Sequence, residues 1–231
     1  MFTDFKLLEE TIGYEFKDKE LLNIALTHSS YVNDHKISKT MDYERTEFLG
    51  DAVLELVTSE YLYKNYPNKD EGNMTKMRAG MVCEKALAIT AKEIGLGKYL
   101  RLGFGEEKSG GRNRDSIIAD VVESVIGAIY LDGGIDKAKE FIHRFVLADC
   151  EHKSMFYDCK STLQELIQKN NNHHLEYEIL SQSGPDHNKT FVVAAVLDGK
   201  VIGQGSGRSK KDAQQNAAYA AILDIKSRKV L

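Results

Sequence analysis

One segment, SIIADVVESVIGAIYLDGG at residues 116–134, constrains the fold of this chain more than any other. Between Ile117 and Leu131, its only charged residues are Asp120 and Glu123, at positions i and i+3. A helix that is apolar almost all round is buried on most sides. The segment therefore predicts a central helix that carries two carboxylates inward. Burying an unpaired carboxylate costs several kcal/mol, and the run contains no Lys or Arg to pair them.

A second segment, YERTEFLGDAVLELV at residues 43–57, carries acids with helical spacing. Glu44, Glu47 and Asp51 lie at i, i+3 and i+7, which places them on one helix face within roughly 60°. The simpler interpretation is a solvated face, which Glu55 would extend. If this helix packs against the first, five carboxylates converge instead. A divalent cation would then relieve their repulsion, and Mg²⁺ is a hard cation that prefers oxygen ligands.

Two glycines support contact between these helices. Gly50 and Gly127 lie inside them, where Gly costs about 1 kcal/mol relative to Ala. Close helix approach explains both positions, with or without a metal. None of the acids begins the Glu-x-x-His pattern of di-iron bundles. The acids therefore favour Mg²⁺-assisted hydrolysis or phosphoryl transfer over iron redox chemistry.

Composition excludes several classes of protein. The 231 residues are 42% hydrophobic and 29% charged, as in ordinary globular domains. No apolar run reaches the roughly 18 residues of a membrane helix, and the N-terminus does not resemble a signal peptide. Three cysteines without a CxxC motif argue against a zinc site and against a disulfide framework. We therefore expect a cytoplasmic protein with no membrane partner.

The periodicity of the sequence divides the chain into two domains. Residues 1–150 predict an all-helical domain, because no strand pattern of period two occurs there. Residues 151–158 are polar and weakly periodic, which is typical of a linker. Residues 159–231 follow the order α-β-β-β-α. The predicted helices of the first domain lie near 4–10, 19–27, 44–64, 73–95, 115–131 and 135–148.

The second domain has clear local signals and a different charge. Asp198–Gly199 between two β-rich runs predicts a hairpin, and Ser209 is a natural N-cap for the Ala-rich helix that follows. Residues 1–157 carry a net charge of −6, and residues 158–231 carry +2. Lys210 and Lys211 lie on the first turn of the last helix, where unpaired N–H groups and the helix dipole favour phosphate. The alternative is a surface helix with two solvated lysines.

These segments resemble a known family. ERTEFLGDAVL resembles the signature of bacterial ribonuclease III, and ADVVESVIGAIYLDGG resembles that family's second acidic motif. ALTHSSY and EGNMTKMRAGMV also look like family segments, in the same order. Tyr43 and Thr46 depart from the family pattern, which commonly has Asn and a larger apolar residue there. The resemblance implies an all-α endonuclease domain that acts as a homodimer.

The resemblance also implies roles for individual residues. The residues that surround a bound Mg²⁺ would be Glu47, Asp51, Asp120 and Glu123, and Mn²⁺ could replace Mg²⁺. Asp51 and Glu123 would be the catalytic residues. Glu44 and Glu71 would lie near the site, although simple exposure in a turn explains Glu71 equally well. Phe48 would pack across the dimer interface, with an ordinary core position as the alternative. His28, in ALTHSSY, is interpreted as structural.

Residues 159–226 resemble the double-stranded RNA-binding domain, a small α+β fold. The resemblance places Gln164 and Glu165 at minor-groove 2′-hydroxyls and His187 in a second minor groove. Lys210 and Lys211 would clamp phosphates across the intervening major groove. The family often has a third basic residue one turn later, where this chain has Gln214. Gln214 would either weaken RNA binding or still hydrogen-bond a phosphate.

The predicted function is that of a Mg²⁺-dependent endoribonuclease that cleaves double-stranded RNA to 5′-phosphate and 3′-hydroxyl ends. Processing of ribosomal RNA precursors and turnover of messenger RNA are the expected roles. One rival is a non-catalytic RNA-binding protein with a decayed nuclease domain, which should have lost some of the five acids. A second rival, a helical scaffold without an RNA role, leaves Asp120 and Glu123 unexplained.

Overall fold

The computed structural model describes residues 5–148, 159–168, 173–184 and 189–227. The chain separates into two compact units, residues 1–150 and 151–231, which are described separately below. The expected linker at 151–158 lies outside the described residues. Among the described helices, none has the length and apolar character needed to cross a membrane.

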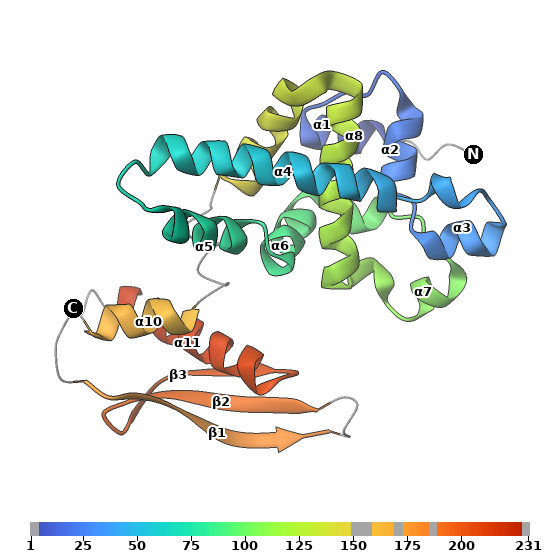
Figure 1. Cartoon of the computed structure of the whole chain (residues 1–231). Coiled ribbons are helices and arrows are strands. Elements are labelled where there is room, and N and C mark those ends of the chain that lie inside the picture. Colours follow the sequence, from blue (N-terminus) through green and yellow to red (C-terminus); the bar gives the residue numbers. More distant parts are fainter. Residues whose placement is uncertain (1–4, 149–158, 169–172, 185–188, 228–231) are drawn as a thin grey trace. The chain divides into compact units, whose positions relative to one another are not determined.

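The described part of the first unit is helical, as the sequence predicts, with one isolated bridge between Thr27 and Arg101. Figure 1 shows α8 crossing α4 near the middle of the unit, with the other helices around this pair. The α-helices are α1 (Lys6–Ile12), α2 (Lys19–Ala25), α3 (Ser29–His35), α4 (Glu44–Asn65), α5 (Glu71–Met81), α6 (Glu84–Ile94), α7 (Phe104–Lys108) and α8 (Asp115–Phe141). Short 3₁₀ turns lie at Lys39–Met41, Leu96–Tyr99 and Gly111–Asn113, and a π-helical turn follows at Ile142–Val146.

Helix α8 is the centre of the core. From Ile117 to Ile129, every residue is buried except Asp120 and Glu123, which are half-buried. The surrounding apolar side chains come from nearly every helix of the unit, from α1 to the π-helical turn. The sequence prediction of a helix buried on most sides is confirmed, and its two acids are the only polar interruption apart from Ser124.

The crossing of α4 and α8 depends on two glycines. A Cβ atom built on Gly50 would overlap the backbone carbonyl oxygen of Glu123, and one built on Gly127 would overlap the carbonyl oxygen of Thr46. The two backbones are therefore in direct contact, and any side chain at either position would separate them. The close approach predicted from the sequence is present.

The structure differs from the sequence expectation at residues 73–95, which form two helices instead of one. Helix α5 begins earlier because the Asp70 carboxylate accepts a hydrogen bond from the Asn73 backbone N–H at 2.8 Å. The chain leaves the helix before α6 because Cys83 is extended, with φ −68° and ψ 157°. The segment has no Pro to signal this break, so periodicity alone continues through it.

Three further local features complete the first unit. Helix α3 was not expected, and it begins because Nδ1 of His28 accepts a hydrogen bond from the Ser30 backbone N–H at 3.1 Å. This cap agrees with the structural interpretation of His28. Helix α7 lies between the predicted helices near 73–95 and 115–131, where no helix was expected. The interruption between the predicted helices near 115–131 and 135–148 is a break inside α8, where Gly134 has φ 81° and ψ −179°.

The second unit has the predicted α-β-β-β-α order. Its elements are α10 (Cys159–Gln168), β1 (Leu175–Ser183), β2 (Thr190–Leu197), β3 (Lys200–Gly207) and α11 (Lys210–Ser227). The strands form an antiparallel sheet in the order β1-β2-β3. Both helices contribute to one core with the inward side chains of the sheet. Asp198 (φ 50°) and Gly199 (φ 79°) form the predicted hairpin turn.

Glycines of β3 allow α11 to lie very close to the sheet. Added Cβ atoms at Gly203, Gly205 and Gly207 would each overlap the backbone of α11. Their spacing of two places them on one face of the strand, and the facing helix residues are mostly alanines. These glycines therefore serve the packing of the domain. Ser209 caps α11 as predicted, since its Oγ accepts a hydrogen bond from the Asp212 backbone N–H at 3.1 Å.

We expect Gly50→Ala to destabilise the first unit by roughly 3 kcal/mol, although Ala is the better helix former, because the methyl group would force α4 away from α8. Gly105→Ala is the matched control, since a Cβ at Gly105 meets nothing within 4 Å. It should be neutral or slightly stabilising. Urea denaturation followed by circular dichroism measures both, and equal stabilities of the two variants would contradict a tight crossing.

Candidate functional site

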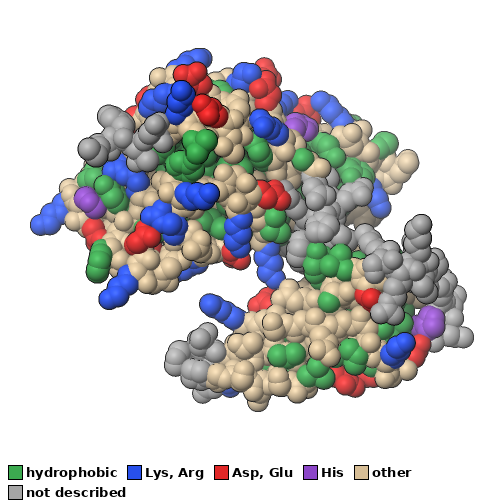
Figure 2. Space-filling model, turned by 180° about the vertical axis from the view of Figure 1, so that it is seen from behind, with side chains coloured by type: hydrophobic (Ala, Val, Ile, Leu, Met, Phe, Trp, Pro, Cys, Tyr) green, Lys and Arg blue, Asp and Glu red, His purple; other side chains and the backbone are tan. Residues whose placement is uncertain are grey.

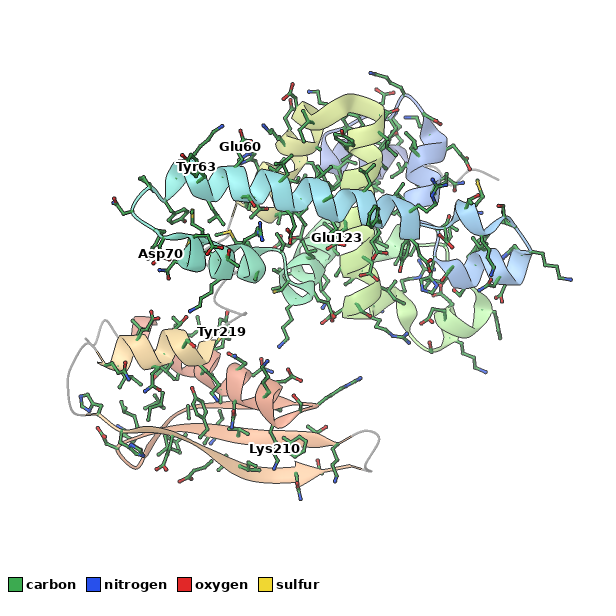
Figure 3. All side chains as sticks on the ribbon, viewed as in Figure 1. Glu60, Tyr63, Asp70, Glu123, Lys210 and Tyr219 are labelled. Atoms are coloured by element: carbon green, nitrogen blue, oxygen red, sulfur yellow. The ribbon has the colours of Figure 1, made fainter. Side chains whose placement is uncertain are left out.

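The crossing of α4 and α8 brings five carboxylates into one cluster, called here the acidic cluster. Its members are Glu44, Glu47, Asp51, Asp120 and Glu123. Glu44 and Asp51 are exposed, whereas the other three are half-buried. Figure 3 shows Glu123 where the two helices cross. The acids of the two helices therefore lie close enough to affect one another's charge.

The charges of the cluster act on one another. Burial raises the pKa of Glu123 to about 8, with further contributions from Asp51, Glu47 and Asp120. Burial also raises the pKa of Glu47 to about 7, and Asp120 adds to this effect. In the absence of a cation, these two acids bind protons near neutral pH. A site that holds carboxylates in this condition is suited to binding a cation.

Asp120 has a partner that the sequence did not suggest. The buried Tyr43 hydroxyl donates a hydrogen bond to the Asp120 carboxylate, which lowers the pKa of Asp120. Burial and the nearby Glu84 outweigh this effect and raise the pKa. Tyr43 occupies a position where the family that this sequence resembles commonly has Asn. Glu84 is the first residue of α6. Only the tertiary contact of three helices connects these residues, so no spacing in the sequence identifies them.

A pair of hydroxyl groups lies inside the crossing. Oγ1 of Thr46 is 2.6 Å from Oγ of Ser124, and Thr46 also donates to the Tyr43 carbonyl oxygen at 2.8 Å. Both side chains are buried. Thr46 immediately precedes Glu47, and Ser124 immediately follows Glu123, so this hydrogen bond lies directly behind the cluster. This hydrogen bond satisfies the buried hydroxyl of Thr46, which occupies a position where the family that this sequence resembles usually has an apolar residue.

The donor set of the cluster fits a hard divalent cation. In the described part of the first unit, no Lys or Arg forms an ion pair with any of the five acids. All available ligand atoms are carboxylate oxygens, which Mg²⁺ prefers. No three His, Cys, Asp or Glu side chains among the described residues form a preformed metal cage. The carboxylates would therefore have to move closer together around a cation.

Glu71 does not join the acidic cluster. It is exposed at the start of α5 and accepts a hydrogen bond from the Thr75 hydroxyl at 3.0 Å. It lines a hollow of about 470 Å³ between α4 and α5, whose other side chains are Leu56, Ser59, Glu60, Leu62, Tyr63, Met74, Thr75 and Arg78. Tyr63 and Asp70 mark the end of α4 and the start of α5 in Figure 3. The role of Glu71 remains a prediction.

Phe48 projects from α4 into solvent. Its side chain is 80% exposed, so it is not part of the core of this chain. A large aromatic side chain exposed in this way is available for contact with another molecule.

Over the face of the first unit seen in Figure 2, basic and acidic side chains are interspersed.

The second unit displays most of its predicted RNA-binding residues. Gln164 and Glu165 are exposed on α10, and Lys210 and Lys211 are exposed on the first turn of α11. Figure 3 shows Lys210 at the start of this helix. Gln214, one turn later, is half-buried and accepts a hydrogen bond from Lys160. His187 lies outside the described residues.

The chain matches two family profiles. Residues 18–150 match the family described as ribonuclease-III-like, and residues 159–225 match the double-stranded RNA binding motif. Together, these two matches include all five acids of the cluster as well as Lys210 and Lys211.

Curated relatives and solved structures agree with these matches. The chain is 50% identical over 223 residues to ribonuclease 3 of Listeria monocytogenes, covering 96% of this chain and 97% of the relative. It is 48% identical over 224 residues to ribonuclease 3 of Oceanobacillus iheyensis, covering 96% and 98%. The nuclease domain of ribonuclease III from Campylobacter jejuni superimposes with a TM-score of 0.59 at 41% identity, covering 63% of this chain and 98% of that domain. That structure is described as flexible in a region involved in dimer formation.

The raised pKa of Glu123 predicts how stability depends on pH. In EDTA, the folded protein keeps a proton on Glu123 up to about pH 8, whereas the unfolded chain loses it near its ordinary value of 4.5. The folded state therefore binds more protons in this range, and its stability falls as pH rises from about 5 to 8. Glu123→Gln should reduce this loss and be more stable than the wild type at pH 8, by on the order of 2 kcal/mol after solvent screening. Urea denaturation at several pH values tests this, and parallel stability curves for the two proteins would contradict it.

Proposed function

Because the chain belongs to the ribonuclease III family of double-strand-specific endoribonucleases, we propose that it cleaves duplex RNA with Mg²⁺ bound at the acidic cluster. The observation that carries this proposal is the convergence of Glu47, Asp51, Asp120 and Glu123 at the crossing of α4 and α8. These four carboxylates would hold the metal, with Mn²⁺ as an alternative. Glu44 lies beside them and extends the negative charge.

The proposed reaction is hydrolysis of a phosphodiester bond. A bound divalent cation supplies a water of lowered pKa and neutralises charge that develops on the phosphate. Asp51 and Glu123 are the proposed catalytic residues, as the family relationship implies. Asp51 is exposed, and burial raises the pKa of Glu123 to about 8. Tyr43 would keep the Asp120 carboxylate oriented through its hydrogen bond. Half-burial of Asp120 and Glu123 limits the water that competes for the site.

The products proposed are a 5′-phosphate and a 3′-hydroxyl, formed when water attacks phosphorus and the bond to the 3′-oxygen breaks. One subunit would cut each strand and leave short 3′ overhangs. Precursors of ribosomal RNA and structured messenger RNAs are the proposed substrates, in the cytoplasm. These statements rest on the family relationship.

A homodimer is proposed to form through the exposed side of α4. Phe48 projects from this helix, and the apolar-lined hollow between α4 and α5 lies on the same helix. Two-fold symmetry places the same patch on both subunits. The aromatic ring of each subunit could therefore be covered by the partner's surface, which would place two acidic clusters in one assembly.

The second domain is proposed to bind the duplex without reading its sequence. Lys210 and Lys211 would contact phosphates, and Gln164 and Glu165 would contact minor-groove 2′-hydroxyls. His187 is proposed for the second minor groove. Such contacts discriminate duplex RNA from DNA by shape and by the 2′-hydroxyl rather than by base sequence.

The central test is Glu123→Gln. This variant keeps the size of the side chain but loses a metal-ligand charge, so cleavage of long duplex RNA with Mg²⁺ should fall roughly 10³-fold or more. Duplex affinity should change little. Asp136→Asn, an exposed position on the same helix, is the control and should cleave normally. Near wild-type cleavage by Glu123→Gln, or cleavage by the wild type in EDTA, would overturn the assignment.

The dimer proposal predicts that Phe48→Ser shifts the protein toward monomer. Losing two copies of a buried phenyl ring should weaken association by roughly 3–6 kcal/mol, which is about 10²- to 10⁴-fold in dissociation constant. Phe104→Ser removes an equally exposed ring, 78% accessible on α7, and should leave association unchanged. Sedimentation equilibrium measures both variants. An unaltered dimer for Phe48→Ser would place the interface elsewhere.

A further inference from the structure

The phosphate clamp of the second domain lacks the third basic residue that the family often has on α11, where this chain has Gln214. Lys210, Lys211 and Gln214 lie on one side of the helix, since they are three and four residues apart. Gln214 is uncharged, so the first two turns of α11 provide two cations rather than three. Its Oε1 is not left to solvent, however, because Nζ of Lys160 donates a hydrogen bond to it at 2.7 Å.

Lys160 is held in place by three contacts from the rest of the domain. Besides the bond to Gln214, its backbone N–H donates to Oε1 of Gln215 at 3.1 Å. Its ammonium group lies 4.8 Å from the centre of the Tyr177 ring. All three partners are uncharged, so none of them neutralises the ammonium group. An ammonium has three N–H donors, and the bond to Gln214 uses one of them.

The position of Lys160 on α10 also relates it to the RNA-binding residues. Lys160 and Gln164 are four residues apart and therefore lie on the same face of the helix. Gln164 is the proposed minor-groove contact, and Gln214 lies one turn beyond the clamp lysines. Lys160 thus shares a helix face with the groove contact on α10 and contacts the residue that follows the clamp lysines on α11. A phosphate that follows the duplex backbone between these contacts would meet its ammonium group.

We propose that Lys160 supplies the third cation of the phosphate clamp, positioned by Gln214 and by the face of Tyr177. The inference rests on the proposed binding of duplex RNA by this domain, and it assigns the missing charge to α10 instead of α11. A glutamine at 214 is then suited to its position, because a lysine there would repel Lys160. The competing explanation is that Lys160 only fastens α10 to α11.

The two explanations differ in how binding depends on salt. Full-length protein is titrated with a short RNA duplex in EDTA at several salt concentrations. Lys160→Gln should weaken binding several-fold and make the log–log salt slope shallower by roughly one unit, because one phosphate contact is lost. Lys200→Gln is the matched control, since it removes the same charge from an exposed lysine at the β2–β3 hairpin. It should bind with the wild-type slope, and so should Lys160→Arg.

Moving the charge gives the sharper test. The double variant Lys160→Gln/Gln214→Lys returns a cation to α11 and should recover the wild-type slope. Because it also restores a lysine–glutamine pair, the effect is assigned to charge only if Lys160→Gln melts at the wild-type temperature. Thermal melting of each variant shows whether the domain is intact. An unchanged slope for Lys160→Gln, or no recovery in the double variant, would overturn the inference.

Lys210→Ala/Lys211→Ala separates this inference from the proposed function. If that variant has a shallower slope while Lys160→Gln does not, the clamp stands and Lys160 is not part of it. If neither variant changes the slope, the clamp itself is wrong and the inference fails with it.

Discussion

The contact between α4 and α8 determines where every proposed metal ligand lies. Gly50 and Gly127 allow the two backbones to touch, and the buried hydroxyl pair of Thr46 and Ser124 joins the helices at the same level. Glu47 and Glu123 are direct sequence neighbours of that pair. A small displacement at the crossing would therefore separate the carboxylates that are proposed to share one cation. The site depends on backbone packing as much as on its acids.

The same crossing makes the first domain electrostatically costly. It surrounds Asp120 and Glu123 with apolar side chains and places the acids of α4 against them without a basic partner among the described residues. Raised pKa values of Glu47 and Glu123 are the measure of that cost. A divalent cation would lower it, so metal binding and stability of the domain are linked. Natural proteins commonly accept such local strain at functional sites.

The second domain needs positive rather than negative charge at its binding surface, since duplex RNA is an anion. In its small core, alanines of α11 pack against glycines of β3. Lys210 and Lys211 project from the start of α11, and Lys160 is held against α11 by Gln214. Positive charge is thus supplied by two helices whose spacing is maintained by a core of small residues.

Much of this protein follows from its sequence alone, because the relevant signals are local. Apolar periodicity predicted the buried helix with Asp120 and Glu123, the Asp198–Gly199 pair predicted the hairpin, and the family motifs predicted the fold of both domains. Gly50 and Gly127 indicated a close helix contact, because glycine inside a helix needs a reason.

Tertiary structure alone decided which distant residues meet. Sequence spacing does not indicate the contact of Tyr43 and Glu84 with Asp120, or the hydrogen bond from Lys160 to Gln214, because these partners lie on different helices. The break before α6 also has no local sequence signal. The exposure of Phe48 likewise could not be predicted, because an apolar residue on a helix suits a core and an interface equally well. Periodicity identifies which face of a helix is apolar, and only packing determines what lies against that face.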